Sequence, residues 1–147
     1  MTESNEQGGG VTGAAAMKRR IINPWTWQDQ FGFVQANELF HARRMLICSG
    51  QTSNDANGTP LHPGDMAAQI QTAFDNLETV LHAADFALKD VMRLTYYTTN
   101  VDLLLQHYGT VVSRLQAGGA RPASTLIGVT RLAFPEWLIE IEATAFK

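Results

Sequence analysis

Only two stretches of the chain carry apolar side chains at the three- and four-residue intervals of an amphipathic helix. The first follows Asp65, a residue type that caps helix N-termini, and runs from Met66 to Ala84. The second spans residues 101–116 and is followed by two glycines, which commonly end helices. The spacing therefore predicts two helices, each with one buried face.

The other patterned segments are rich in β-branched and aromatic residues, as strands are. They cover residues 33–39, 44–49, 91–99, 125–131 and 137–145. The short link between the first two predicts that they form an antiparallel pair. Residues 53–64 hold an Asn-Gly pair, two prolines and two glycines, so we expect a loop there.

The small number of helices limits how the sheet can be covered. Two helices cannot shield both faces of a sheet built from these strands, so we expect them to pack on one face. The other face would carry apolar residues such as Phe33, Leu46 and Ile127. We therefore expect a second copy of the chain to cover that face.

Composition excludes several classes of protein. Residues 1–17 are rich in Gly, Ala and polar residues and are expected to be a disordered tail, followed by a single domain over residues 18–147. One cysteine excludes an intrachain disulfide. A formal net charge of -3 argues against a nucleic-acid partner, and no apolar run approaches the ~20 residues of a membrane helix. The four histidines lack metal-ligand spacing, so we expect no metal. Because the chain has one cysteine and no apolar run of membrane length, we expect a cytoplasmic protein without a membrane partner.

Glu140 and Glu142 are the acidic residues with the clearest chemical potential. They alternate with apolar residues and therefore share one face of the last strand. An ionised carboxylate there is costly unless it is paired or functional, and burial would raise its pKa and fit it for proton transfer. The alternative is a solvated edge strand, or an ion pair with Arg131 or Arg93.

Two further reactive residue types have simpler interpretations. Cys48 lies in a strand-like run, and a small buried apolar residue explains it better than a nucleophile does. Arg121 precedes Pro122 and could bind a carboxylate with two hydrogen bonds, but a loop arginine in water is the simpler interpretation.

A set of short motifs, in order and at their spacing, resembles the RidA/YjgF/UK family over residues 20–147. The motifs are Ser49-Gly50-Gln51, Ala67-Ala68-Gln69, Asp75-Asn76-Leu77, Tyr108, Pro122-Ala123, Thr130-Arg131-Leu132 and Ile139-Glu140-Ile141-Glu142-Ala143. The resemblance implies an α+β, chorismate-mutase-like fold, with a mixed six-stranded sheet and two helices on one face. It also implies a homotrimer with a central barrel and a cleft at each subunit boundary. Active members hydrolyse reactive imines and enamines without a metal or organic cofactor.

The resemblance also implies roles for particular residues. Glu140 corresponds to the glutamate that positions water, and the Ser49-Gly50 turn helps to hold the substrate. Phe33 stands where well-known members carry a pocket tyrosine. Two positions depart from the family pattern, because Ser124 replaces the arginine that binds the substrate carboxylate and Leu126 replaces a cysteine.

Three functional interpretations stay open at this stage. The chain is a deaminase for a less acidic or larger imine, or Arg121 replaces the missing guanidinium and restores acidic substrates. Alternatively, catalysis is lost and the trimer binds a small ligand. A ribonuclease role, an older label of the family, has little support from an acidic chain.

Overall fold

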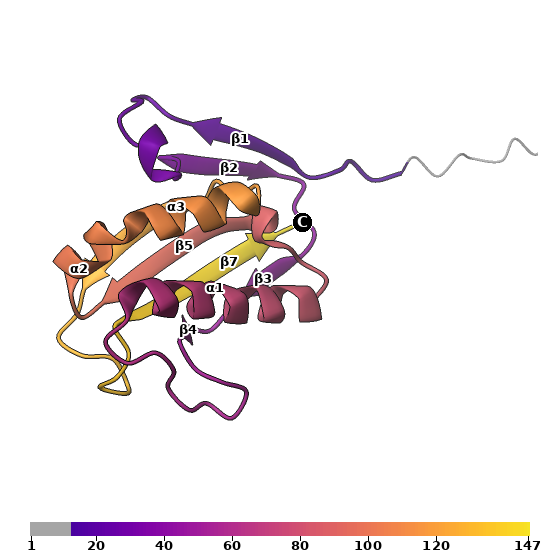
Figure 1. The fold of residues 1–147 in the computed structure, drawn as a ribbon. Coiled ribbons are helices and arrows are strands. Elements are labelled where there is room, and N and C mark those ends of the chain that lie inside the picture. The colour runs from indigo at the N-terminus through magenta and orange to yellow at the C-terminus, as the bar shows by residue number, and fades with distance from the viewer. Residues whose placement is uncertain (1–12) are drawn as a thin grey trace, which may run out of the picture.

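The fold is a mixed sheet with helices on one side and a separate strand pair at its edge (Figure 1). A computed structural model describes residues 13–147. The strands are β1 (Lys18–Ile22), β2 (Ala36–Phe40), β3 (Met45–Ile47), β4 (Gln51–Thr52), β5 (Val91–Thr98), β6 (Ala123–Gly128) and β7 (Ile139–Phe146). The α-helices are α1 (Met66–Ala83), α2 (Val101–Gln106) and α3 (Tyr108–Ala117), and short 3-10 helices cover Asp29–Phe31 and Leu88–Asp90.

Strand β7 is the centre of the main sheet. It pairs antiparallel with β3, β4 and β5, and β5 pairs in parallel with β6, the arrangement of a mixed sheet. Its apolar residues are buried and belong to one core cluster with residues of α1 and α3. Figure 1 shows both helices running across one side of this sheet. The predicted α+β class and the placement of the helices on one face are confirmed.

Helix α1 forms where the sequence predicts it. The Asp65 carboxylate caps the first turn by accepting a hydrogen bond from the Ala68 N–H at 3.0 Å. The predicted apolar stripe is the buried face: Met66, Ile70, Ala73, Phe74, Leu77 and Leu81. Burial of this stripe against β7 anchors the helix to the sheet.

The second predicted helix is two helices. The break falls at His107, whose N–H is shared between the carbonyls of Leu103 and Leu104 instead of continuing a regular α-helical pattern. Gly109 lies just beyond, and glycine has a weak helix propensity. The apolar spacing continues through the break, which is why the sequence pattern does not mark it.

The predicted pairing of residues 33–39 with 44–49 is wrong. Strand β2 instead pairs antiparallel with β1, and β3 pairs with β7. His41, between them, adopts a positive φ of 59°, which turns the chain away from a simple hairpin. The main sheet therefore has five strands instead of six, and β1 and β2 form a two-stranded sheet of their own.

The strand pair is nevertheless attached to the edge of the main sheet. Val34 forms a parallel bridge with Ala123 in β6, and its N–H donates to the Pro122 carbonyl at 3.0 Å. The Asn37 side-chain amide donates to the Met92 carbonyl at 2.9 Å. These contacts hold the segment that carries Phe33 beside β6.

The start of β1 at Lys18 coincides with the expected start of the folded domain. Residues 13–17 have no regular secondary structure, and residues 1–12 of the expected tail lie outside the described residues. The expectation of a disordered tail over residues 1–17 therefore stays a prediction.

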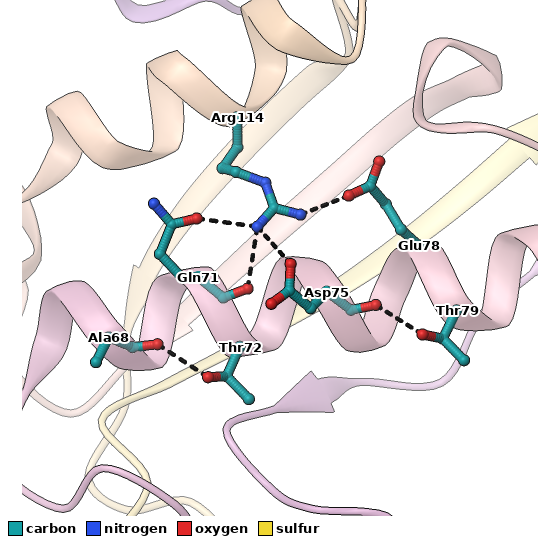
Figure 2. Close-up of polar contacts among 7 residues, drawn as sticks. All are labelled: Ala68, Gln71, Thr72, Asp75, Glu78, Thr79 and Arg114. Atoms are coloured by element: carbon teal, nitrogen blue, oxygen red, sulfur yellow. Dashed lines mark hydrogen bonds and ion pairs between the residues drawn. The ribbon is translucent and has the colours of Figure 1, made fainter.

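Arg114 ties α3 to α1 through charged contacts (Figure 2). Its guanidinium donates to the Asp75 carboxylate at 2.6 Å and to the Glu78 carboxylate at 2.5 Å. A third contact reaches the Gln71 side chain at 2.9 Å, and the guanidinium lies 5.5 Å from the centre of the Phe74 ring. Because the Arg114 side chain is only 17% exposed, these hydrogen bonds are partly shielded from water.

We predict that Arg114→Met lowers the free energy of unfolding by about 2 kcal/mol, because it leaves two neighbouring carboxylates without their shared cation. Urea denaturation monitored by circular dichroism measures the loss. Arg20→Met is the matched control, since the Arg20–Glu38 pair is much more exposed, and should cost below about 1 kcal/mol. Equal losses in the two variants would contradict a special role for Arg114.

Candidate functional site

The predicted site residues fall into two groups on opposite sides of the main sheet. Glu140 lies between the buried Ile139 and Ile141, so its side chain points away from the helices. Ser124 and Leu126 are direct neighbours of the buried Leu94 and Tyr96 across the β5–β6 pair, so they point to the helix side. We call the side of the sheet that bears Glu140 the open face.

The first group consists of Ser49, Gly50 and Glu140, here called the Glu140 group. A Cβ atom on Gly50 would lie 1.9 Å from Oε1 of Glu140, so the carboxylate rests directly against this glycine. Ser49 is exposed beside it. The absence of a side chain at residue 50 is what makes room for the carboxylate.

The electrostatic surroundings of Glu140 favour its protonated form. Burial raises the pKa of the Glu140 carboxyl above its usual value, and the neighbouring Glu142 carboxylate raises it further. Within residues 13–147 Glu140 forms no ion pair, since Arg93 donates to the Thr125 hydroxyl and Arg131 to backbone carbonyls. The alternative of an ion pair with either arginine is therefore not what the structure shows.

Tyr97 is a member of this surface that the sequence analysis missed. It is the direct neighbour of Glu140 across the β5–β7 pair, and its hydroxyl donates to the Glu142 carboxylate at 2.5 Å. This hydrogen bond is the main cause that raises the pKa of the Tyr97 hydroxyl. The sequence of residues 91–99 predicts a strand, but only the pairing of that strand with β7 shows that Tyr97 lies beside the acidic residues.

The second group lines an apolar hollow of about 450 Å³ on the helix side of β6. We call it the aromatic hollow; its walls are Phe31, Phe33, Leu105, Tyr108 and Leu126. The structure thus brings together Phe33 and Leu126, which were predicted from the resemblance. Phe31, Leu105 and Tyr108 join them from the 3-10 helix, α2 and α3. Tyr108 belongs to the set of family-like motifs, but its sequence position alone does not predict its place in this wall.

Two buried hydroxyl groups lie behind this wall outside ordinary hydrogen-bond geometry. They are the Tyr96 hydroxyl and Ser124 Oγ. The Tyr96 ring packs edge to face on Tyr108, with ring centres 6.1 Å apart. Burial raises the pKa of Tyr96 well above its usual value, the Tyr108 hydroxyl raises it further, and the Ser124 hydroxyl lowers it. The three hydroxyl groups therefore lie close to one another.

Arg121 lies apart from the aromatic hollow in a single chain, and its suggested role in a cleft between copies stays a prediction. It lines a separate hollow of about 430 Å³ at the end of α3, together with Asp29 and Gly32. Its carbonyl accepts hydrogen bonds from the side chains of Arg19 and Asn37. Within one chain, Arg121 is therefore not among the residues that line the aromatic hollow with Phe33 and Leu126.

Other reactive residue types are accounted for by packing. Cys48 is buried, and burial raises the pKa of its thiol, as in a packing residue and unlike a nucleophile.

In residues 13–147 no three His, Cys, Asp or Glu side chains gather as a metal site would require. A search of the same residues finds no helix with the length and apolar character needed to cross a membrane.

Comparison with known proteins gives consistent matches. The family model of endoribonuclease L-PSP matches residues 31–147. The RutC family protein YjgH of Escherichia coli is 31% identical over 99 residues, covering 67% of this chain and 74% of that protein. Among solved structures, YyfB of Yersinia pestis, described as a Rid family protein of unknown function, is 40% identical with a TM-score of 0.77, covering 88% and 98% of the two chains. The Escherichia coli YjgF gene product is 28% identical with a TM-score of 0.64, and the match covers 78% of this chain and 87% of that one.

The raised pKa of Glu140 predicts a pH-dependent effect on stability. A folded-state pKa above the unfolded value means that stability is fully present below the unfolded pKa, near 4.5, and is lost as the pH rises through the folded pKa. Glu140→Gln cannot undergo this loss. The difference in Tm between Glu140→Gln and the wild type should therefore be more positive at pH 7 than at pH 4, measured by differential scanning calorimetry.

The two causes of the shift can be separated by a second variant. In Glu142→Gln, carboxyl-carbon NMR titration should give a Glu140 pKa that is lower than in the wild type. It should stay above the usual value, because burial is the larger cause. A pKa at or below 4.5 in the wild type would contradict the electrostatic description of this site.

Proposed function

The chain belongs to the family of the endoribonuclease L-PSP model, which includes the Rid and YjgF proteins, and from this membership we propose that it hydrolyses reactive imines and enamines. The reaction is R₂C=NH + H₂O → R₂C=O + NH₃, and an enamine enters it as its imine tautomer. An imine carbon is already electrophilic, so the protein needs to hold it, place a water beside it and transfer protons. A side chain with a raised pKa suits the last task, and Glu140 is that side chain.

The observation that carries this proposal is the position of Glu140. Its carboxylate rests on Gly50, carries no paired cation in the described part of the chain, and holds its proton more tightly than an ordinary glutamate. In this arrangement the carboxyl group can accept a proton from water and return it to the leaving nitrogen. Glu140 is therefore assigned as the catalytic residue, with Ser49 and Gly50 beside it.

The active cleft is proposed to form between copies of the chain. The Glu140 group and the aromatic hollow lie on opposite sides of one sheet, so they cannot act on the same molecule within one chain. The open face also exposes Met45 (58%), Ile47 (71%) and Ile127 (39%) around the acidic residues. Exposed apolar side chains on one face are typical of an interaction surface. A homotrimer would bring the Glu140 group of one copy to the aromatic hollow of the next.

A catalytically inactive, ligand-binding trimer is the alternative, because Ser124 in place of the arginine removes the family's carboxylate anchor.

RNA cleavage is disfavoured, since a net charge of -3 opposes binding to a polyanion. A reducing, cytoplasmic location is proposed because the single cysteine is a free thiol in the core.

We predict that the wild type accelerates the hydrolysis of imines that amine and amino-acid oxidases generate in situ. Glu140→Gln should lower this acceleration by about 100-fold or more, because general acid–base catalysis contributes about that much. The imine lifetime is followed by ultraviolet absorbance.

The assembly is tested by a separate variant. Ile47→Asp places a charge on the open face, so it should abolish the trimer, measured by light scattering, and with it the activity. Full acceleration by a monomer would contradict a cleft between copies, and a trimer that accelerates no imine would favour the ligand-binding alternative.

Gly50→Ala tests the placement of the carboxylate separately from its chemistry. The added methyl group must displace the Glu140 carboxylate, so activity should fall by at least about tenfold, since small displacements of a catalytic group have large effects on rate. Gly109→Ala is the matched control, because a Cβ there meets no atom within 4 Å and the residue lies in α3. Equal activity in the two variants would show that Glu140 does not need its observed position.

A further inference from the structure

We infer that the substrates of this site are imines with an aromatic or branched apolar substituent and no carboxylate. This inference rests on the proposed hydrolase function and names its substrate class. It depends on three features of the aromatic hollow: its lining, its arrangement of rings, and the two hydroxyl groups behind its wall.

The lining contains no charged side chain. All five residues of the aromatic hollow are aromatic or leucine, and Leu126 and Leu105 close it from β6 and α2. Placing a carboxylate against such a surface removes its hydration without replacing it, which is strongly unfavourable. A neutral apolar substituent has no such cost and gains from burial.

The aromatic rings that line the hollow already make edge-to-face contacts. Phe33 packs on Trp27 with ring centres 5.8 Å apart, and Phe31 packs on Tyr108 at 6.1 Å. Aromatic rings attract one another in this geometry, so an aromatic substituent in the hollow would make the same kind of contact. A volume of about 450 Å³ accommodates a ring and its linker, whereas a three-carbon imine would leave most of it empty.

The polar groups behind the wall carry no charge. The Tyr96 hydroxyl and Ser124 Oγ are both buried, and neither residue is among those that line the hollow. Tyr96 lies directly beside Leu126 across the strands and packs on Tyr108, and the Tyr108 and Ser124 hydroxyls both affect its pKa. These hydroxyls therefore offer no charged, two-pronged contact of the kind that a carboxylate prefers.

Neither nearby arginine lines the aromatic hollow. Arg121 lines the separate hollow at the end of α3 with Asp29. Arg93 points to the open face, where its guanidinium donates to the Thr125 hydroxyl at 2.7 Å. In the strand register Arg93 lies level with Thr144, four residues along β7 from Glu140.

The test compares two pairs of imines that differ by the carboxylate. Phenylalanine and alanine are oxidised by an amino-acid oxidase, and phenethylamine and ethylamine by an amine oxidase, each in the presence and absence of the full-length protein. The measured quantity is the factor by which the protein shortens the imine lifetime, which corrects for the intrinsic reactivity of each imine. We expect the phenethylamine-derived imine to be accelerated at least about tenfold more than the phenylalanine-derived and ethylamine-derived imines.

Two charge-introducing variants test the inference directly. Ser124→Arg should reverse the preference toward the phenylalanine-derived imine, and Ser124→Ala is its control for the loss of the hydroxyl alone. Because an arginine there has to enter a half-buried position, Leu105→Lys provides a second test at a residue that is 55% exposed. It should raise the acceleration of the carboxylate-bearing imine relative to the neutral one, and Leu105→Gln should not.

Each outcome separates this inference from the proposed function. Stronger acceleration of the amino-acid-derived imines by the wild type would overturn the substrate class and leave the hydrolase function intact. An unchanged preference in both Ser124→Arg and Leu105→Lys would also overturn it, because the lining would then not select against charge. No acceleration of any of the four imines, by a correctly assembled protein, would overturn both.

Discussion

Strand β7 bears apolar side chains on one face and two acidic side chains on the other, and the rest of the structure depends on how each face is covered. Its apolar residues need cover, and α1 and α3 provide it from one side. Glu140 and Glu142 therefore necessarily face the other side, where no helix of the described chain covers them. The position of the helices thus decides which face is available for chemistry.

Two adjacent carboxyl groups on that face would repel each other if both were fully ionised and unpartnered. The structure treats them differently, since Tyr97 donates a hydrogen bond to Glu142 and Glu140 rests against Gly50 without a partner. One carboxylate is therefore held as an acceptor, while the other has a raised pKa. The two similar residues therefore have different surroundings, and in the proposed function only Glu140 transfers protons.

The sequence predicts most of this arrangement where a pattern is local and periodic. The helix over residues 66–84, its Asp65 cap and the shared face of Glu140 and Glu142 all follow from spacing, and the structure confirms them. The pairing of β2 with β1 does not follow, because Lys18–Ile22 is short and charged and the turn at His41 depends on an unusual backbone conformation. Local pattern also cannot show that Ser124 and Glu140 point to opposite sides of the sheet, since that depends on which neighbours each strand acquires.

The location of Glu140 and the aromatic hollow on opposite sides of one chain has a genetic consequence in the proposed trimer. Each copy would give its carboxylate to one cleft and its aromatic wall to another. A chain defective only in Glu140 and a chain defective only in its hollow would each be inactive alone. Mixed in one assembly, they would regenerate clefts built from the two intact halves, so complementation between two damaged alleles is a property of this architecture.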